Sequence, residues 1–416
     1  MSKILLLMAC IICLAARSSG QSNPLDAKLK MAYEFTNKGD YDAADSFIDG
    51  LLKENPGYGD GWDLLVQVRY KLYEKSKESA NLFKSLTVSS SKDGKQIDAK
   101  GDTLGRQLMD MLKKMDPSKM AYSKFEYTLR KATLLSPEAW QSSTYMRLLY
   151  VDPNIDSNVN KKALRDFEEG EKEFEQKNYN KAALLYKKAI EEQPDFYKAS
   201  LYMGDCYYAT ENYKDAAEAF KEAVKRFPNL LEPRKYLCDA YAKLSAYESS
   251  AQAAMEAMTV YPDYTMFQKL EDALYLNHQA LNIQRTQRGV FPNRMEDTSE
   301  NDPNTYRDTI PATGPWMAYQ AAYNKMKPYC NKKGLIVKAN KLTSSKYLEV
   351  YSWEEMLKNS NDKILDEARR MQKLNYLDCY VLVTCFHQDL YPQYLDLVTN
   401  HRDRVLAYFK AFIKSQ

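Results

Sequence analysis

Residues 163–264 repeat one 34-residue pattern three times: ALRDFEEGEKEFEQKNYNKAALLYKKAIEEQPDF (163–196), YKASLYMGDCYYATENYKDAAEAFKEAVKRFPNL (197–230) and LEPRKYLCDAYAKLSAYESSAQAAMEAMTVYPDY (231–264). Small residues and prolines recur at four fixed positions: Gly170, Gly204 and Cys238 at position 8; Ala182, Ala216 and Ser250 at position 20; Ala189, Ala223 and Ala257 at position 27; Pro194, Pro228 and Pro262 at position 32. Three consecutive copies in phase predict one structural unit that repeats.

Each unit is predicted to form two antiparallel helices joined by a short turn. Two helices approach closely only where their side chains are small, so we expect the residue at position 8 to face the small residue at position 20. Large aromatic residues then fill the space beside this contact, such as Tyr186 and Phe220 at position 24. The proline at position 32 cannot continue a helix and therefore ends the second one.

These segments closely resemble the tetratricopeptide-repeat family, whose 34-residue helix–turn–helix repeat has small residues at positions 8, 20 and 27 and proline at position 32. Residues 25–58 resemble a fourth copy, with Ala32 at position 8, Ala44 at position 20 and Pro56 at position 32. The resemblance implies an all-α chain built as a curved helix–turn–helix solenoid. It also implies that the chain binds a protein or peptide partner.

The segments on either side of the three clear units are predicted to be helical as well. Residues 21–162 are expected to contain the fourth copy followed by two or three drifted hairpins, with a polar loop over 89–102. Residues 265–288 are expected to form one amphipathic helix that covers the end of the repeats. Residues 289–315 are rich in Asp, Asn, Pro and Thr and are expected to be a linker loop, either mobile or acting as a lid.

Residues 316–416 are predicted to form a mainly helical C-terminal module, which resembles no family and is expected to be a small separate module docked on the repeats. Helices are expected over residues 316–326, 353–358, 362–374, 376–386 and 392–413. Two short runs, 334–338 and 347–351, are rich in β-branched, aromatic and other apolar residues, so they could instead be strands.

The first twenty residues have the layout of a secretory signal peptide that is cleaved before Gln21. Lys3 is followed by an apolar run over residues 4–16 and then by small residues. This run is too short for a relaxed membrane span, which needs about 20 residues. Lipid attachment at Cys10 or Cys13 is the less favoured alternative. Because the chain contains no Asn-x-Ser/Thr sequon, an exported protein of a bacterial periplasm is favoured over a eukaryotic secretory route.

The charge balance gives no reason to expect nucleic-acid binding. Removing residues 1–20 takes away two bases, Lys3 and Arg17, and no acid, so the net charge of +3 falls to +1. A nearly neutral chain has no general attraction to nucleic acid or to anionic membranes. No later segment is apolar for long enough to be a transmembrane segment.

The sequence lacks catalytic and metal-binding patterns. None of the three histidines belongs to an HExxH motif or to a paired spacing for zinc, and no phosphate-binding loop or GxSxG motif is present. Cys385 and His387 are two positions apart on an expected helix and so point away from each other. Cys206 and Cys238 are expected to be small core residues, with a disulfide between them as the alternative. We therefore expect no enzyme activity, catalytic residue, metal or cofactor.

The family resemblance also implies where a partner binds. In this family the first helix of each repeat lines the concave side of the superhelix, and positions 2, 5, 9 and 12 look outward. The candidate peptide-binding residues at these positions are Phe167, Glu171, Lys198, Leu201, Asp205, Tyr208, Lys235 and Asp239. Members that clamp a C-terminal carboxylate use Lys and Asn at positions 5 and 9, where the first two units of this chain hold Phe167 and Glu171, then Leu201 and Asp205. Its acids at position 9 predict instead a partner that carries Lys, Arg or a free amine.

Taken together, these patterns predict a protein–protein interaction scaffold or adaptor in the bacterial envelope, which binds protein segments on its concave face. Two alternatives stay open. The chain could be an enzyme whose active site lies in the C-terminal module, which a pocket lined by Cys385, His387 and carboxylates would favour. It could also be a purely structural subunit of an envelope complex, which a concave groove blocked by the C-terminal helices would favour.

Overall fold

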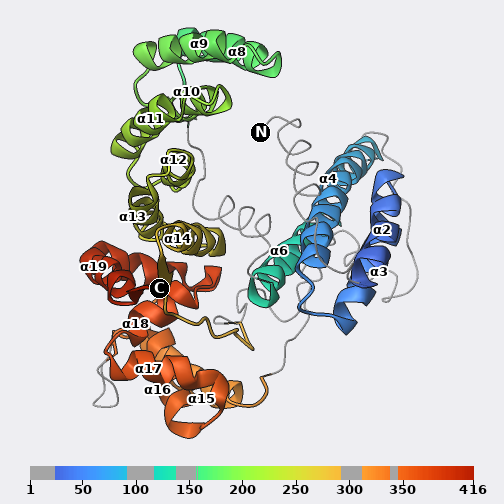
Figure 1. Ribbon diagram of the computed structural model, residues 1–416. Helices are drawn as coiled ribbons and strands as arrows, with labels where there is room; N and C mark the ends of the chain where they lie inside the picture. The colour runs from blue at the N-terminus through green and yellow to red at the C-terminus, as the bar shows by residue number, and fades with distance from the viewer. Residues whose placement is uncertain (1–23, 91–116, 137–155, 157, 292–311, 338–344) are drawn as a thin grey trace. The chain divides into compact units, whose positions relative to one another are not determined.

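The computed structural model describes residues 24–90, 117–136, 156, 158–291, 312–337 and 345–416 (Figure 1). The chain divides into two compact units, one ending at Thr128 and the other beginning at Leu129. Among the described residues, no helix is long and apolar enough to cross a membrane. The proposed signal peptide and most of the loops predicted over 89–102 and 289–315 lie outside these residues.

The N-terminal unit begins with a helical hairpin, α2 (Pro24–Asn37) and α3 (Tyr41–Glu54). Ala32 and Ala44, the small residues predicted at positions 8 and 20, are both fully buried. The next helix, α4 (Gly59–Ser90), has 32 residues, and the next one described is α6 (Pro117–Leu135). The 34-residue period therefore does not continue through residues 59–90, because one long helix replaces the expected hairpin. Of the region predicted to hold the remaining hairpins, residues 91–116 and 137–155 lie outside the described residues.

A buried arginine organises the N-terminal unit. The Arg69 guanidinium lies 2.5 Å from the Asp45 carboxylate and 2.8 Å from that of Asp49, and it also donates to the Thr128 hydroxyl. Lys124 of α6 adds a second contact to Asp45 at 2.5 Å. This network joins α3, α4 and α6 through polar contacts that neutralise the buried charge.

The three clear repeats form three successive helical hairpins in which each helix packs against the next (Figure 1). Their helices are α8 (Lys161–Glu175), α9 (Tyr179–Glu192), α10 (Tyr197–Ala209), α11 (Tyr213–Arg226), α12 (Glu232–Lys243) and α13 (Tyr247–Ala257). The predicted fold class, an all-α solenoid of helix–turn–helix units with a mainly helical C-terminal part, is confirmed.

The turn inside each hairpin has the same backbone geometry. Position 15 adopts a left-handed conformation in every copy, with φ of 64° at Lys177, 60° at Glu211 and 57° at Ser245. Gly39 occupies the equivalent position of the hairpin α2–α3 and has φ of 75°. One left-handed residue lets the chain reverse between two helices, so this shared geometry supports the alignment of residues 25–58 with the three later copies.

The small residue at position 8 makes room for the aromatic at position 24. A Cβ atom added to Gly170 would come within 2.7 Å of the Tyr186 ring, and one added to Gly204 would collide with the Phe220 ring. In the third unit the sizes are exchanged, with Cys238 at position 8 and Ala254 at position 24. In the first two units the ring thus lies directly against the glycine, and in the third unit the Ser250 hydroxyl at position 20 donates to the Cys238 carbonyl oxygen at position 8.

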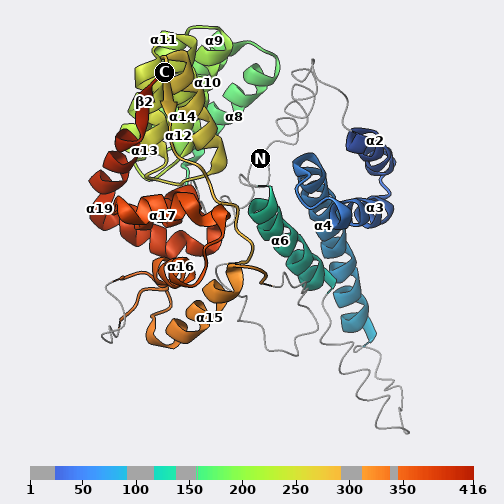
Figure 2. The same ribbon diagram turned by 60° about the horizontal axis from the view of Figure 1, so that its bottom comes forward.

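The helix after the repeats is shorter than predicted. α14 (Tyr264–Leu276) is capped by the Asp263 side chain, and it buries the expected apolar face that includes Phe267 and Leu270. The prediction of one helix over 265–288 is wrong beyond Leu276. His278 has a φ of 56°, and the chain continues as strand β1 (Gln279–Leu281), which pairs antiparallel with β2 (Ile413–Ser415) (Figure 2).

The C-terminal part is a set of short helices followed by a long one. They are α15 (Trp316–Met326), η1 (Lys327–Tyr329), α16 (Leu348–Asn359), η2 (Lys363–Leu365), α17 (Asp366–Lys373), α18 (Leu377–Cys379), the π-helix η3 (Tyr380–Thr384), η4 (Gln388–Leu390) and α19 (Tyr391–Ala411). The prediction of a strand over 347–351 is wrong, since Leu348 begins α16. Residues 334–337 contribute only isolated bridges, Cys330 with Ile336 and Leu335 with Tyr347.

One hydrophobic core joins the last repeats to the C-terminal helices. The Tyr394 hydroxyl donates to the Met258 carbonyl oxygen at 2.8 Å, and the rings of Phe267 and Phe409 lie 5.7 Å apart. Residues 316–416 are therefore continuous with the end of the repeat stack, and the expectation of a separate docked module is wrong.

Candidate functional site

The residues predicted to bind a partner lie on the first helices α8, α10 and α12. Two of them, Phe167 and Leu201, are 8% and 5% exposed. The Phe167 ring packs 4.8 Å from that of Phe196 and 5.7 Å from that of Tyr202. These two side chains fill the space between repeats, so little of either is left for a partner to contact.

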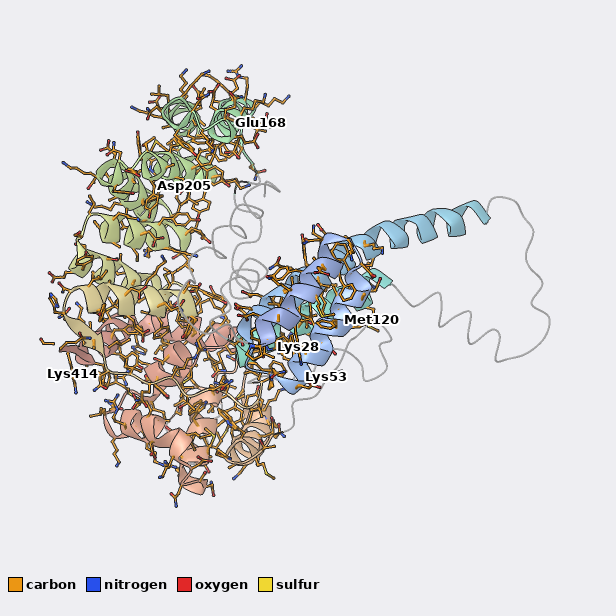
Figure 3. All side chains as sticks on the ribbon, turned by 45° about the vertical axis from the view of Figure 1, so that its right-hand side comes forward. Lys28, Lys53, Met120, Glu168, Asp205 and Lys414 are labelled. Atoms are coloured by element: carbon orange, nitrogen blue, oxygen red, sulfur yellow. The ribbon has the colours of Figure 1, made fainter. Side chains whose placement is uncertain are left out.

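The three acids at position 9 have different surroundings. Glu171 accepts a hydrogen bond from the Tyr186 hydroxyl, and Asp239 pairs with Lys269 of α14. Asp205, labelled on α10 in Figure 3, is half-buried, and no hydrogen bond or ion pair reaches its carboxylate from the described residues. Asp205 is thus the one acid of this row whose charge is left unsatisfied within the described part of the chain.

Burial and repulsion from neighbouring acids raise the pKa values of Glu171 and Asp205. Burial raises the pKa of Glu171, although the hydrogen bond from Tyr186 opposes the change. Burial and the neighbouring Glu171 charge together raise the pKa of Asp205 to about 7. Burial, with the charges of the same two acids, also raises the pKa of Tyr202 to about 12. A positive group placed beside Asp205 would relieve this repulsion.

The remaining predicted residues surround this row. Lys198 is exposed and Lys235 is half-buried. Tyr208 is half-buried and meets Tyr213 edge-on, with ring centres 5.1 Å apart. Tyr202, Asp205 and Tyr208 are three residues apart along α10 and therefore share one face of the helix. The face combines an unsatisfied carboxylate with two tyrosines.

Sequence reasoning missed two residues that shape this face. Tyr202 is at position 6, which was not among the outward positions, although its aromatic character was visible. Lys269 neutralises Asp239 from the helix that follows the repeats. If the 34-residue period is continued beyond residue 264, Lys269 falls at position 5 of a further unit. The repeat alignment could therefore have predicted that Lys269 lies near Asp239.

Among the described residues, Cys385 and His387 do not form a nucleophile–base pair. The Cys385 thiol is fully buried, and burial raises its pKa. His387 is also buried, with Nε2 3.3 Å from the Arg130 carbonyl oxygen and Nδ1 accepting from the Asp389 backbone N–H at 3.3 Å. Neither residue lines the cleft of about 830 Å³ found among the C-terminal helices. The pocket that would have favoured an enzyme is therefore not formed by these two residues.

Within the described ranges, no three His, Cys, Asp or Glu side chains gather in a way that could hold a metal ion. Cys206 and Cys238 are both buried free thiols. Burial and nearby acids raise the pKa of each to about 12, which makes them poor nucleophiles.

A family model for the tetratricopeptide repeat matches residues 173–229, from the end of α8 to the loop after α11. This segment belongs to the tetratricopeptide-repeat family. The match includes one complete helical hairpin and most of the preceding one, and the C-terminal part of the chain lies outside it. Tetratricopeptide repeats are protein–protein interaction scaffolds, and this is the class of function that the family indicates for the chain.

Three solved structures, two of them described as tetratricopeptide-repeat proteins, are also similar to this chain. A complex of the TPR2AB domain of yeast Sti1 with an Hsp90 peptide is 12% identical over 60% of this chain and 97% of that one, with a TM-score of 0.26. A thermophilic tetratricopeptide-repeat protein of Thermus thermophilus is 18% identical over 60% and 98%, with a TM-score of 0.22. The apo form of RapI is 10% identical over 93% and 99%, with a TM-score of 0.26. No curated protein matches the chain.

Proposed function

We propose that the chain is a scaffold that binds a protein segment along the first-helix face of α8, α10 and α12, and that Asp205 receives a Lys, Arg or free amine of that segment. The observation that carries the proposal is the Asp205 carboxylate, which has no hydrogen bond or ion pair from the described residues. Its neighbours in the row, Glu171 and Asp239, already have partners.

The surroundings of Asp205 favour a cation over other ligands. Glu171 lies close enough for its charge to raise the pKa of Asp205. Two carboxylates that interact with each other attract one positive group more strongly than either would alone. Tyr202 and Tyr208 lie one turn away on each side, and their rings can contact an ammonium or guanidinium group or the methylene chain that carries it. Phe167 and Leu201 would support this face from inside rather than touch the partner.

The place of action is part of the same proposal. The charged start, apolar run and small residues of the first 20 residues support export with cleavage before Gln21. The lack of glycosylation sequons supports a bacterial periplasm. In that setting the repeats 163–264 would bind the partner, and residues 316–416 would extend the end of the stack.

Crosslinking of the tagged chain in cells, followed by binding assays with the recovered protein, tests the proposal. Asp205→Asn keeps the shape of the side chain and removes its charge, so we expect partner binding to weaken about tenfold, as for loss of one charge-assisted hydrogen bond. Glu218→Gln is the matched control, because Glu218 is an exposed acid on the second helix α11. Equal affinities of the Asp205→Asn variant and the unaltered chain would contradict the role given to Asp205.

A further inference from the structure

The C-terminal part contains a cleft that the repeats do not form. Its walls are the extended segment Gln284–Gly289, the start of α15 around Trp316, and the residues from Asp362 to Glu367, with Leu135 at one edge. Figure 2 shows the extended segment leaving α14 toward the C-terminal helices. The cleft has a volume of about 830 Å³, which is within the range of roughly 300–1,000 Å³ typical of small-molecule sites.

Arg285 lines this cleft without a carboxylate partner among the described residues. Its guanidinium donates to the Phe386 carbonyl oxygen at 3.2 Å and lies 5.6 Å from the centre of the Tyr264 ring. Other arginines of the C-terminal part are neutralised: Arg288 by Glu349 at 2.5 Å, Arg369 by Asp366 at 2.7 Å, Arg370 by Glu367 at 2.5 Å and Arg404 by Asp378 at 2.8 Å. The acids that neutralise the other four arginines do not pair with Arg285. Its positive charge and some of its hydrogen-bond donors are therefore left unused.

Arg288, whose charge Glu349 neutralises, adds an unused hydrogen-bond donor to the cleft. This side chain also lines the cleft, is only 4% exposed, and has an Nε with no hydrogen-bond partner in the described structure. Burial lowers the pKa of Arg285, and the charge of Arg288 lowers it further. A buried donor without a partner calls for a ligand, a water or an ion.

The acids on the cleft wall do not cancel this charge. Asp366 and Glu367 are paired with Arg369 and Arg370. Asp362 accepts a hydrogen bond from the Ile364 backbone N–H, which caps the short helix η2. Lys363, which is exposed and also lines the cleft, offsets the charge that this hydrogen bond leaves on Asp362.

We propose that this cleft binds a small molecule that carries an oxyanion, a carboxylate or a phosphate, and that Arg285 and Arg288 hold that group. A guanidinium presents parallel N–H donors that match two oxygens of either anion. Glu349 neutralises Arg288. The oxyanion would neutralise Arg285. This inference is independent of the proposed partner-binding face, because it uses residues of the C-terminal part alone.

Calorimetric titration of the purified chain with sodium phosphate and, separately, with sodium citrate tests the proposal at constant ionic strength set by sodium chloride. We expect saturable binding of at least one anion. Arg285→Gln should weaken it at least about tenfold, since a hydrogen bond to a charged group is lost. Arg402→Gln, which removes an exposed guanidinium of α19 outside the cleft, should leave it unchanged. Binding of phosphate alone or of citrate alone would show which oxyanion the cleft prefers.

Absence of saturable binding for both anions would overturn the proposal, and so would equal weakening in the Arg285→Gln and Arg402→Gln variants. Circular dichroism establishes that each variant is folded. Should Arg285→Gln fail to fold, Arg285→Lys decides the matter. It keeps the charge and loses the paired donors, so binding should weaken while the fold is retained, and unchanged binding would exclude Arg285 as the anion ligand.

Discussion

The Tyr186 hydroxyl donates a hydrogen bond to the Glu171 carboxylate, so the ring that fills the space over Gly170 also anchors the acid at position 9 of the same repeat. One side chain of α9 thereby contributes both to the packing of the hairpin and to the hydrogen bonding of the Glu171 carboxylate. In the second unit Phe220 takes the place of this tyrosine. Asp205 consequently has no hydroxyl of this kind to satisfy it.

Removing the Tyr186 hydroxyl should destabilise the repeats without changing their packing. Tyr186→Phe leaves the half-buried Glu171 carboxylate without its donor, and we expect a loss of about 1 kcal/mol in the free energy of unfolding. Tyr179→Phe is the control, because Tyr179 packs against Phe174 and its hydroxyl has no hydrogen bond in the described structure. Urea denaturation measures both variants. Equal midpoints for the two would show that the hydrogen bond contributes nothing.

A methyl group at position 8 should be costly where an aromatic lies against the glycine. Gly204→Ala places a Cβ against the Phe220 ring, which is fully buried and cannot move away freely. Overpacking of this kind costs about 1–3 kcal/mol. Gly50→Ala in α3 meets no atom within 4 Å and should instead stabilise its helix by up to about 1 kcal/mol. Opposite shifts in thermal unfolding temperature are expected, and a stabilising effect at Gly204 would contradict this packing.

The left-handed turn position predicts another pair of opposite effects. Glu211 adopts a φ of 60°, which costs a residue with a side chain about 1 kcal/mol relative to glycine. Glu211→Gly should therefore stabilise the second hairpin by up to that amount, reduced by the greater freedom of glycine in the unfolded chain. Gly39→Ala, at a φ of 75°, should destabilise the hairpin α2–α3. Chemical denaturation of the two variants tests this, and shifts in the same direction would refute the explanation.

The raised pKa of Asp205 predicts how stability depends on pH. Burial and Glu171 raise it to about 7 from an ordinary value of 3.8, so between these pH values the folded chain holds a proton that the unfolded chain has released. The contribution of this site to stability is therefore complete below about pH 4 and is lost as the pH rises toward 7. Asp205→Asn removes the cost of ionisation, so this variant should be the more stable one at pH 8, by on the order of 1 kcal/mol after allowance for solvent at a half-buried group.

Urea denaturation of the unaltered chain and of the Asp205→Asn variant at pH 5 and pH 8 measures this difference. The advantage of the variant should shrink at the lower pH, and Glu218→Gln should show no comparable dependence, since Glu218 is exposed. A constant advantage at both pH values would mean that the Asp205 carboxyl titrates normally.

The repeats were predictable because their information is local. The 34-residue phase located six helices, their turns and the buried small residues, since each of these depends on neighbours within one or two units. The burial of Phe167 and Leu201 was less apparent, because apolar residues at an outward position can also fill the gap between adjacent repeats. Only coordinates show which of the two occurs.

Features that depend on distant parts of the chain were missed. Strand β1 is three residues long and exists because β2 pairs with it from the other end of the C-terminal part. The run 347–351 has the composition of a strand, yet Val350 and Tyr351 are buried in a helix because the shared core surrounds α16 on several sides. The cleft around Arg285 is built from three segments far apart in sequence, so no local sequence pattern predicts it.

The pairing of Gln279 with Ser415 also has a consequence for how the chain is made. Hairpins such as α8–α9 need only adjacent residues and can form while synthesis proceeds. The pairing of β1 with β2 at the far end of the stack cannot form until residue 415 has been added. The apolar faces of α13 and α14 are likewise without cover until Tyr394 and Phe409 of α19 have been made. A growing chain therefore passes through a stage in which its repeats are folded and one end still needs protection from aggregation.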